Sequence, residues 1–149
     1  MGLHRCLCIV LLSTACVGGQ MTSSYMAASP SPTPDVFSCV RGQLKANKWD
    51  QTSIDVNDNR LTARKYDETV RRPDVSFRRL VNRLEIQVAP GAGGDTVSAL
   101  SVLARTFAET VTQRGPTETQ EATSETAKTG AQTIIDKCGG QVDSLSVPE

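Results

Sequence analysis

The sequence has few of the residues on which several classes of function depend. Among its 149 residues there is one histidine, His4, and the aromatic residues are three Phe, two Tyr and one Trp. Ser-His-Asp and Cys-His catalysis, histidine-ligated zinc and histidine pH switches all require an imidazole. Stacking of nucleic-acid bases requires exposed aromatic rings. The composition therefore argues against these kinds of enzyme, zinc site and nucleic-acid-binding protein.

The sequence also lacks an excess of charge of one sign and a long hydrophobic run. Its 16 Lys and Arg balance 16 Asp and Glu, which argues against a polybasic arm or an acidic tail as the main feature. The apolar stretch at residues 6–12 is shorter than the roughly 20 residues that span a bilayer. The length suits a single domain, since domains usually run to about 100–200 residues.

The first 15 residues have the pattern of a secretory signal. A short positive segment, Met1–Arg5, precedes the apolar stretch, and small residues follow as far as Ala15. We therefore expect residues 1–15 to be removed as a signal peptide and the protein to be exported. Because His4 leaves with this segment, the mature chain is expected to contain no histidine.

The residues before Cys16 resemble a known processing motif. Leu12-Ser-Thr-Ala-Cys16 is similar to the lipobox of bacterial lipoproteins, although Ser13 stands where that family prefers Leu, Val or Ile. The resemblance implies a diacylated Cys16 and a protein anchored in the cell envelope, on the outer membrane if the host has one. Two acyl chains give durable anchoring, since each buried CH₂ contributes about 0.8 kcal/mol. The alternative is ordinary signal-peptidase cleavage after Ala15 or near Ala28, which releases a secreted or periplasmic protein.

The rest of the chain divides into a linker, a domain and a short tail. Residues 16–33 are rich in Ser, Pro and small side chains without an apolar period, which predicts a flexible tether. Residues 34–140 contain the amphipathic patterns and are predicted to form a single α+β domain. Residues 141–149 are predicted to be a polar tail.

Amphipathic helices are predicted at both ends of the domain. The first, over about residues 34–47, begins at Thr33-Pro34-Asp35, which combines a capping side chain, proline in the first turn and an acidic residue. The second begins at Ser124-Glu125 and stops at Gly139-Gly140. Their apolar positions at helical spacing are Val36, Phe37, Val40 and Leu44, and then Ala127, Ala131, Ile134, Ile135 and Cys138.

Four antiparallel strands are predicted between the helices. Residues 54–63 alternate between apolar and polar on either side of Asn57-Asp58-Asn59, which predicts a hairpin. Residues 75–89 form a long strand, with Asn82, Leu84, Ile86 and Val88 on one face and Arg79, Val81 and Arg83 on the other.

Residues 96–110 fit a helix or a strand. We predict a strand, because the segment follows a glycine-rich loop of hairpin length and matches the preceding strand in length. Residues 111–123 are predicted to be a loop around Gly115-Pro116. The expected fold is a four-stranded antiparallel meander flanked by an N-terminal and a C-terminal helix on one face. This order resembles the helix-grip domains of small bacterial envelope lipoproteins, and the resemblance implies no functional residue apart from Cys16.

Cys39 and Cys138 lie on the apolar sides of the two predicted helices. In an exported protein, this placement favours a disulfide between them. Reduced buried thiols are the alternative. A redox or nucleophilic role is disfavoured, because the chain has no Cys-x-x-Cys motif and no histidine to activate a thiol.

Basic residues gather between residues 60 and 83. This segment holds eight of them against three acidic residues, whereas residues 109–149 hold seven acidic and three basic residues. One interpretation makes Arg71, Arg72, Arg79 and Arg83 a surface for an anionic partner such as lipid headgroups, phosphorylated glycans or an acidic protein. The other interpretation is that these arginines form ion pairs with the acidic segment on a solvated sheet face.

The sequence offers no constellation for catalysis, metal binding or a cofactor. Four acidic residues in and after the predicted hairpin, Asp55, Asp58, Asp67 and Glu68, lack the spacing of a calcium loop. We expect a noncatalytic cell-envelope lipoprotein that presents a small domain for interaction or maintenance. It would be held at the membrane by N-terminal acyl chains, contact an envelope protein and bind no nucleic acid. The alternative is a carrier of an apolar or amphiphilic ligand between the helices and the sheet.

Overall fold

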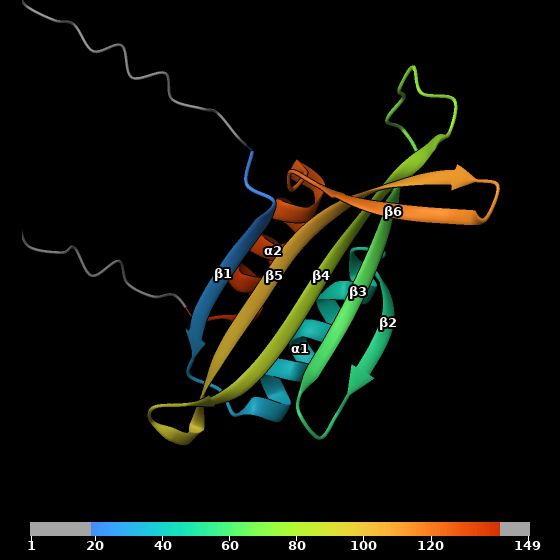
Figure 1. Cartoon of the computed structure of the whole chain (residues 1–149). Helices are drawn as coiled ribbons and strands as arrows, with labels where there is room; N and C mark the ends of the chain where they lie inside the picture. Colours follow the sequence, from blue (N-terminus) through green and yellow to red (C-terminus); the bar gives the residue numbers. More distant parts are fainter. Residues whose placement is uncertain (1–18, 141–149) are drawn as a thin grey trace, which may run out of the picture.

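Two helices lie on one face of an antiparallel sheet in the computed structural model, which describes residues 19–140 (Figure 1). The elements are β1 Thr22–Ser29, α1 Thr33–Ala46, β2 Asp50–Asp55, β3 Arg60–Asp67, β4 Phe77–Gly91, β5 Gly94–Thr112, β6 Gly115–Glu121 and α2 Glu125–Cys138. The predicted α+β class is confirmed. Within the described residues, neither helix has the length and apolar character needed to cross a membrane.

The sheet is a meander to which two further strands are added along one edge. Its order is β1-β5-β4-β3-β2, and β6 also pairs with β5. β1 lies opposite residues 98–105 of β5, and β6 lies opposite residues 106–112. Because β4 occupies the other edge of β5, β1 and β6 lie end to end along the same edge. Gln120 Nε2 joins them by donating to the backbone oxygen of Met21 at 2.8 Å.

The sequence predicted four strands, but the sheet formed by residues 19–140 has six, because β1 and β6 were not predicted. Residues 22–29 were expected in the tether and 115–121 in a loop, yet both are strands. The small and polar side chains of β1 give no apolar alternation, although Ser23 and Ser29 are buried, and no residue of β6 is buried. Both strands are stabilised by backbone hydrogen bonds to the long β5. Their side chains therefore show no apolar pattern from which a strand could be predicted. The first helix is therefore preceded by a strand and does not begin the domain.

The other predicted elements are confirmed with small shifts of their ends. The hairpin is β2 and β3, the long strand is β4, and residues 96–110 lie within β5. Ser124 caps α2, since its side chain accepts a hydrogen bond from the backbone N–H of Ala127. The side chain of Thr33 makes no capping bond at α1. Its hydroxyl lies 3.3 Å from the hydroxyl of Ser98 on β5.

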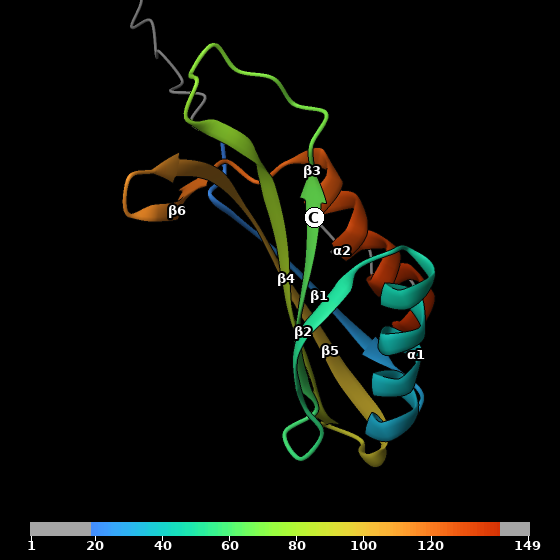
Figure 2. The ribbon, with the colours of Figure 1, turned by 90° about the vertical axis from the view of Figure 1, so that its right-hand side faces the viewer.

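The helices and the sheet form two layers, seen edge-on in Figure 2. The core side chains lie between these layers. Val36, Val40 and Leu44 of α1 and Ala127, Ala131 and Ile134 of α2 pack against alternate residues of β3, β4 and β5. The predicted disulfide is confirmed: Cys39 and Cys138 are bonded, with their Cα atoms 5.8 Å apart. It joins the two helices above the sheet.

A polar cluster also connects the sheet to α2. The buried Asn82 accepts hydrogen bonds at Oδ1 from the hydroxyls of Thr106 at 3.0 Å and Ser124 at 2.6 Å. Thr106 Oγ1 in turn accepts from the backbone N–H of Ser124 at 2.9 Å. The start of α2 is therefore placed on β4 and β5 by directional bonds as well as by apolar packing.

Two helical glycines are expected to respond in opposite ways to alanine. Gly130 of α2 faces Trp49, where an added Cβ would lie 2.4 Å from ring atom Cζ2, whereas nothing lies within 4 Å of a Cβ on Gly42 of α1. Gly42→Ala should raise the free energy of unfolding by about 1 kcal/mol. Gly130→Ala should lower it by roughly 1–3 kcal/mol through overpacking. Urea unfolding of the two variants measures both effects, and an equal gain in both would contradict the packing of Trp49 on α2.

Candidate interaction surface

Among residues 19–140, no helix or further strand covers the sheet face opposite the helices, which is called the open face here (Figure 2). Side chains alternate between the two faces of a strand, so the residues between the core positions point to this face. On the three central strands they are Thr62, Arg64, Tyr66, Arg79, Val81, Arg83, Glu85, Gln87, Ser101, Leu103, Arg105 and Phe107. The β5–β6 ribbon bends toward the open-face side of the sheet.

Three arginines form a row across the open face. Arg64 of β3 lies opposite Arg83 of β4, and Arg83 lies opposite Arg105 of β5. Like charges in such positions destabilise a sheet unless they are compensated. Arg83 donates to Glu118 at 2.7 Å, and Arg105 donates to Glu85 at 2.8 Å.

Arg64 is the exception in this row, because it has no ion pair within residues 19–140. Its Nη1 donates to the hydroxyl of Tyr66 at 3.2 Å, and its Nε is buried without a hydrogen-bond partner. The hydrogen bond to Tyr66 raises the pKa of Arg64 above its usual value. Within residues 19–140, Arg64 is therefore the one arginine of the row without a direct ion pair, although the nearby charges of Glu118 and Glu109 also help to raise its pKa.

Aromatic rings lie beside the row, under two guanidinium groups. The Arg79 guanidinium lies 3.6 Å from the centre of the Tyr66 ring, and that of Arg83 lies 4.5 Å from the centre of the Phe107 ring. Both geometries allow cation–π attraction. Arg64, Tyr66, Arg79, Arg83 and Phe107 are called the aromatic–arginine cluster below. The cluster also covers Val81, which is fully buried although it points to the open face.

The four arginines predicted to meet an anionic partner lie on two neighbouring elements. Arg71 and Arg72 lie in the connection between β3 and β4, whereas Arg79 and Arg83 lie on β4. Three of them form ion pairs with the segment after residue 108: Arg72 with Glu121, Arg79 with Glu109 and Arg83 with Glu118. Arg71 donates to backbone oxygens of its own loop. These three arginines therefore form ion pairs with the acidic segment, as one of the two interpretations from the sequence expected.

Glu109 is the most enclosed of the acidic partners. Its residue is 6% exposed, and Oε1 lies 3.2 Å from Arg78 Nη1 and 3.2 Å from Arg79 Nε. Oε1 has no well-aligned hydrogen bond, whereas Oε2 accepts one from Arg79 at 3.3 Å. The contact is therefore mainly one of charge, and it holds Arg79 against Tyr66.

The ion pair between Arg72 and Glu121 shifts the pKa of both groups. Both carboxylate oxygens of Glu121 accept hydrogen bonds from Arg72. These bonds lower the pKa of Glu121 below its usual value and raise that of Arg72. Since Glu121 ends β6 and Arg72 lies before β4, the pair ties the β3–β4 connection to the β5–β6 ribbon.

Two of the four acidic residues considered for calcium, Asp55 and Asp67, serve as turn caps. Asp55 Oδ1 accepts from the backbone N–H groups of Asn57 and Asp58, at 3.0 and 3.1 Å. Asp67 accepts from the hydroxyl and the backbone N–H of Thr69, and these bonds lower the pKa of Asp67. Among residues 19–140, no three His, Cys, Asp or Glu side chains gather as metal ligands do.

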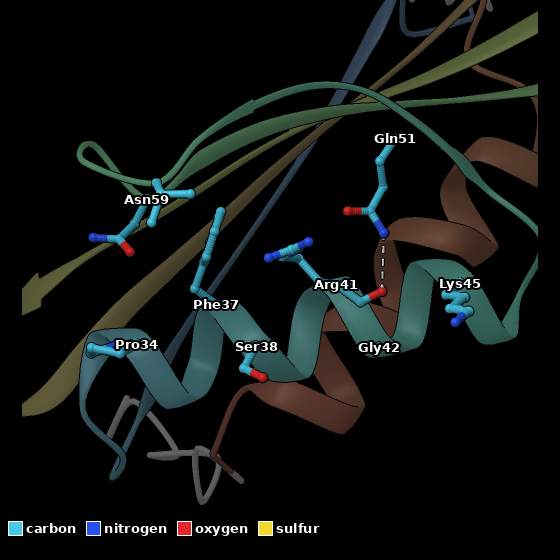
Figure 3. A pocket seen from close by; sticks show the side chains of 9 residues that line it. Pro34, Phe37, Ser38, Arg41, Gly42, Lys45, Gln51 and Asn59 are labelled. Atoms are coloured by element: carbon cyan, nitrogen blue, oxygen red, sulfur yellow. Dashed lines mark hydrogen bonds between the residues drawn. The ribbon is translucent and has the colours of Figure 1, made fainter.

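A groove of about 500 Å³ lies between α1 and the β2–β3 hairpin (Figure 3). Its lining combines the apolar Phe37 and Val56 with the basic Arg41 and Lys45, and Gln51 donates to the backbone oxygen of Arg41 at 3.2 Å. The groove lies beside α1 and opens to solvent. The groove therefore lies between a helix and two strands of the sheet, which is where the alternative considered from the sequence places an amphiphilic ligand.

No protein-family model matches this chain, and no curated protein matches it. Cys16, the signal segment 1–15 and the tail 141–149 lie outside the described residues. The function is therefore inferred from the open face, the disulfide and the N-terminal sequence pattern.

Proposed function

We propose that the protein is a noncatalytic lipoprotein of the cell envelope whose domain binds another envelope protein through the open face. The sequence pattern of residues 1–16 supports export and acylation at Cys16. The disulfide between Cys39 and Cys138 supports export independently. Disulfides persist in oxidising compartments and are rare in the cytosol.

The aromatic–arginine cluster is the observation that carries the proposal. Tyr and Arg are enriched among the residues that dominate binding energy in protein interfaces. Here the rings and guanidinium groups are already held in place by Glu109 and Glu118, so little side-chain freedom is lost when a partner covers them. Both helices of the described chain lie on the other face of the sheet, so the open face is accessible to a partner (Figure 2).

Arg64 indicates the chemistry of the partner. Its charge has no carboxylate partner within the described residues, while both neighbours in the row are paired. A carboxylate of the partner placed over Arg64 would complete the row and gain from the exclusion of water. We therefore propose an envelope protein that presents an acidic side chain to the centre of the open face.

Photo-crosslinking in cells tests the proposal with the whole chain. A photoreactive phenylalanine analogue is placed at Thr62, on the open face, or at Gln132, on the exposed side of α2. We expect a discrete crosslinked protein in the membrane fraction from position 62 and none from 132. Arg64→Glu should reduce the crosslink about tenfold, as expected for the loss of a charge pair of more than 1 kcal/mol.

Two controls distinguish the parts of the proposal. Lys45→Glu reverses an exposed charge on α1 and should leave the crosslink at position 62 unchanged. Cys16→Ser should remove the protein from the membrane fraction. Equal crosslinks from positions 62 and 132 would exclude the open face as the binding surface. A crosslink from position 62 that survives Arg64→Glu would exclude the proposed acidic contact at Arg64. An intact leader in the cytoplasm would exclude export.

A further inference from the structure

The chain enters the domain at one particular end. The backbone oxygen of Gln20 accepts from Thr123 N–H at 2.8 Å, next to the junction of β1 and β6. The β3–β4 connection, residues 68–76, reaches the same region through the ion pair of Arg72 with Glu121. We call this end, with Met21, residues 68–76 and the β5–β6 turn, the Met21 end; it lies in the upper part of Figure 1.

The start of β1 brings the Met21 end close to the proposed anchor. The sequence predicted an 18-residue tether between Cys16 and the first helix, but β1 begins at Thr22. Six residue steps span at most about 20 Å, since a fully extended chain advances about 3.3–3.6 Å per residue. An acyl chain on Cys16 would therefore hold the start of β1, beside Met21, within about 20 Å of the bilayer surface.

Apolar side chains are exposed at this end. Val75 is fully exposed in the β3–β4 connection, and Met21 and Val111 are about half exposed. Val75 and Val111 are close in space, because the backbone oxygen of Ser76 accepts from Val111 N–H at 2.8 Å. Exposed apolar side chains that lie together, as Val75 and Val111 do, mark contact sites for proteins or membranes.

Arginines surround these apolar residues. Arg71 and Arg114 are exposed and make no ion pair within residues 19–140, and the side chain of Arg78 is 55% exposed. Glu68, Glu118 and Glu121 in this region form ion pairs with Arg79, Arg83 and Arg72. Asp74 accepts a hydrogen bond from the hydroxyl of Ser76, which is neutral, so Asp74 keeps its negative charge. Arg71 and Arg114 are therefore the basic residues at the Met21 end that have no ion pair within residues 19–140.

We propose that the Met21 end rests on an anionic lipid surface, with Val75 and Val111 among the headgroups and Arg71 and Arg114 on lipid phosphates. The inference rests on the proposed anchor at Cys16. Arginine side chains can place their stems along apolar surface while their charged groups stay at the headgroups. Anionic leaflets attract each such residue independently of any protein partner. The contact would leave the open face directed away from the bilayer or along it, accessible to a partner protein.

Tryptophan quenching in vesicles tests this contact. The acylated protein, purified from membranes, is reconstituted in vesicles that contain brominated lipid and either phosphatidylglycerol or phosphatidylcholine alone. Val75→Trp adds a fluorophore at the Met21 end, and Val56→Trp adds a matched one at the β2–β3 turn, another exposed valine. The unchanged protein, with Trp49 alone, supplies the background. We expect the added tryptophan to be quenched at position 75 and not at 56, and only in the anionic vesicles.

The double change Arg71→Glu, Arg114→Glu should abolish the quenching at position 75. Equal quenching at 75 and 56, quenching at neither position, or equal quenching in both kinds of vesicle would overturn the inference. Flotation of the same samples separates this failure from that of the anchor. A protein that floats with the vesicles but shows no quenching at 75 overturns only the contact. A protein that does not float overturns the anchor as well.

Discussion

Reduction of the Cys39–Cys138 disulfide is expected to lower the free energy of unfolding by about 4 kcal/mol. The bonded residues are 99 positions apart in the sequence. For a closed loop of about 100 residues, the chain-entropy model gives roughly 4.7 kcal/mol, and removal of native disulfides usually costs 2–5 kcal/mol. Because a domain of this size is stable by only about 5–15 kcal/mol, the bond accounts for a large share of the total.

Urea unfolding of the same chain under oxidising and reducing conditions measures this effect without a change of residue. Cys39→Ala with Cys138→Ala is the matched variant, and it should be insensitive to the reductant. Cys138 is 6% exposed and packs in the core, so the variant should also lose a small packing contribution in both conditions. A reduced wild-type protein that unfolds at the same urea concentration as the oxidised one would contradict the prediction.

The second large effect is expected for Glu109→Gln, which should lower the free energy of unfolding by about 3 kcal/mol. Glu109 is nearly inaccessible and lies 3.2 Å from groups of both Arg78 and Arg79. The side chain of Arg79 is only 15% exposed, and its remaining acidic partner, Glu68, is largely in solvent. Neutralising Glu109 therefore leaves a guanidinium that is shielded from water and poorly compensated.

Glu118→Gln is the matched control for this prediction. Glu118 lies directly opposite Glu109 across β5 and β6 and pairs with Arg83. Its side chain is 27% exposed, so water can replace the lost charge, and a cost of about 0–1 kcal/mol is expected. Thermal or urea unfolding compares the two variants. Similar losses in both would show that burial of Glu109 does not set the strength of its contact.

The candidate site could be predicted from the sequence only in part. Strand parity in residues 75–89 correctly separates Arg79 and Arg83 from the buried Leu84, because alternation along a strand is a local property. The neighbours of Arg83 could not be found in this way. That Arg64 and Arg105 flank it depends on the registers of β3 and β5 against β4, and a one-residue slip would place different residues there.

The sequence by itself determined the two helices and the long strand β4, since each follows from apolar periodicity or from local start and stop residues. For β5 the periodicity fitted a helix as well as a strand, and only the preceding glycine-rich loop and the length favoured the strand. The pairing of Cys39 with Cys138 was favoured over free thiols and is confirmed by the structure. Only the tertiary structure decided that residues 22–29 and 115–121 form strands, because their stability comes from hydrogen bonds to β5 and not from an apolar pattern of their own. The same long-range pairing places Arg64 in its row and makes β1 begin six residues after Cys16.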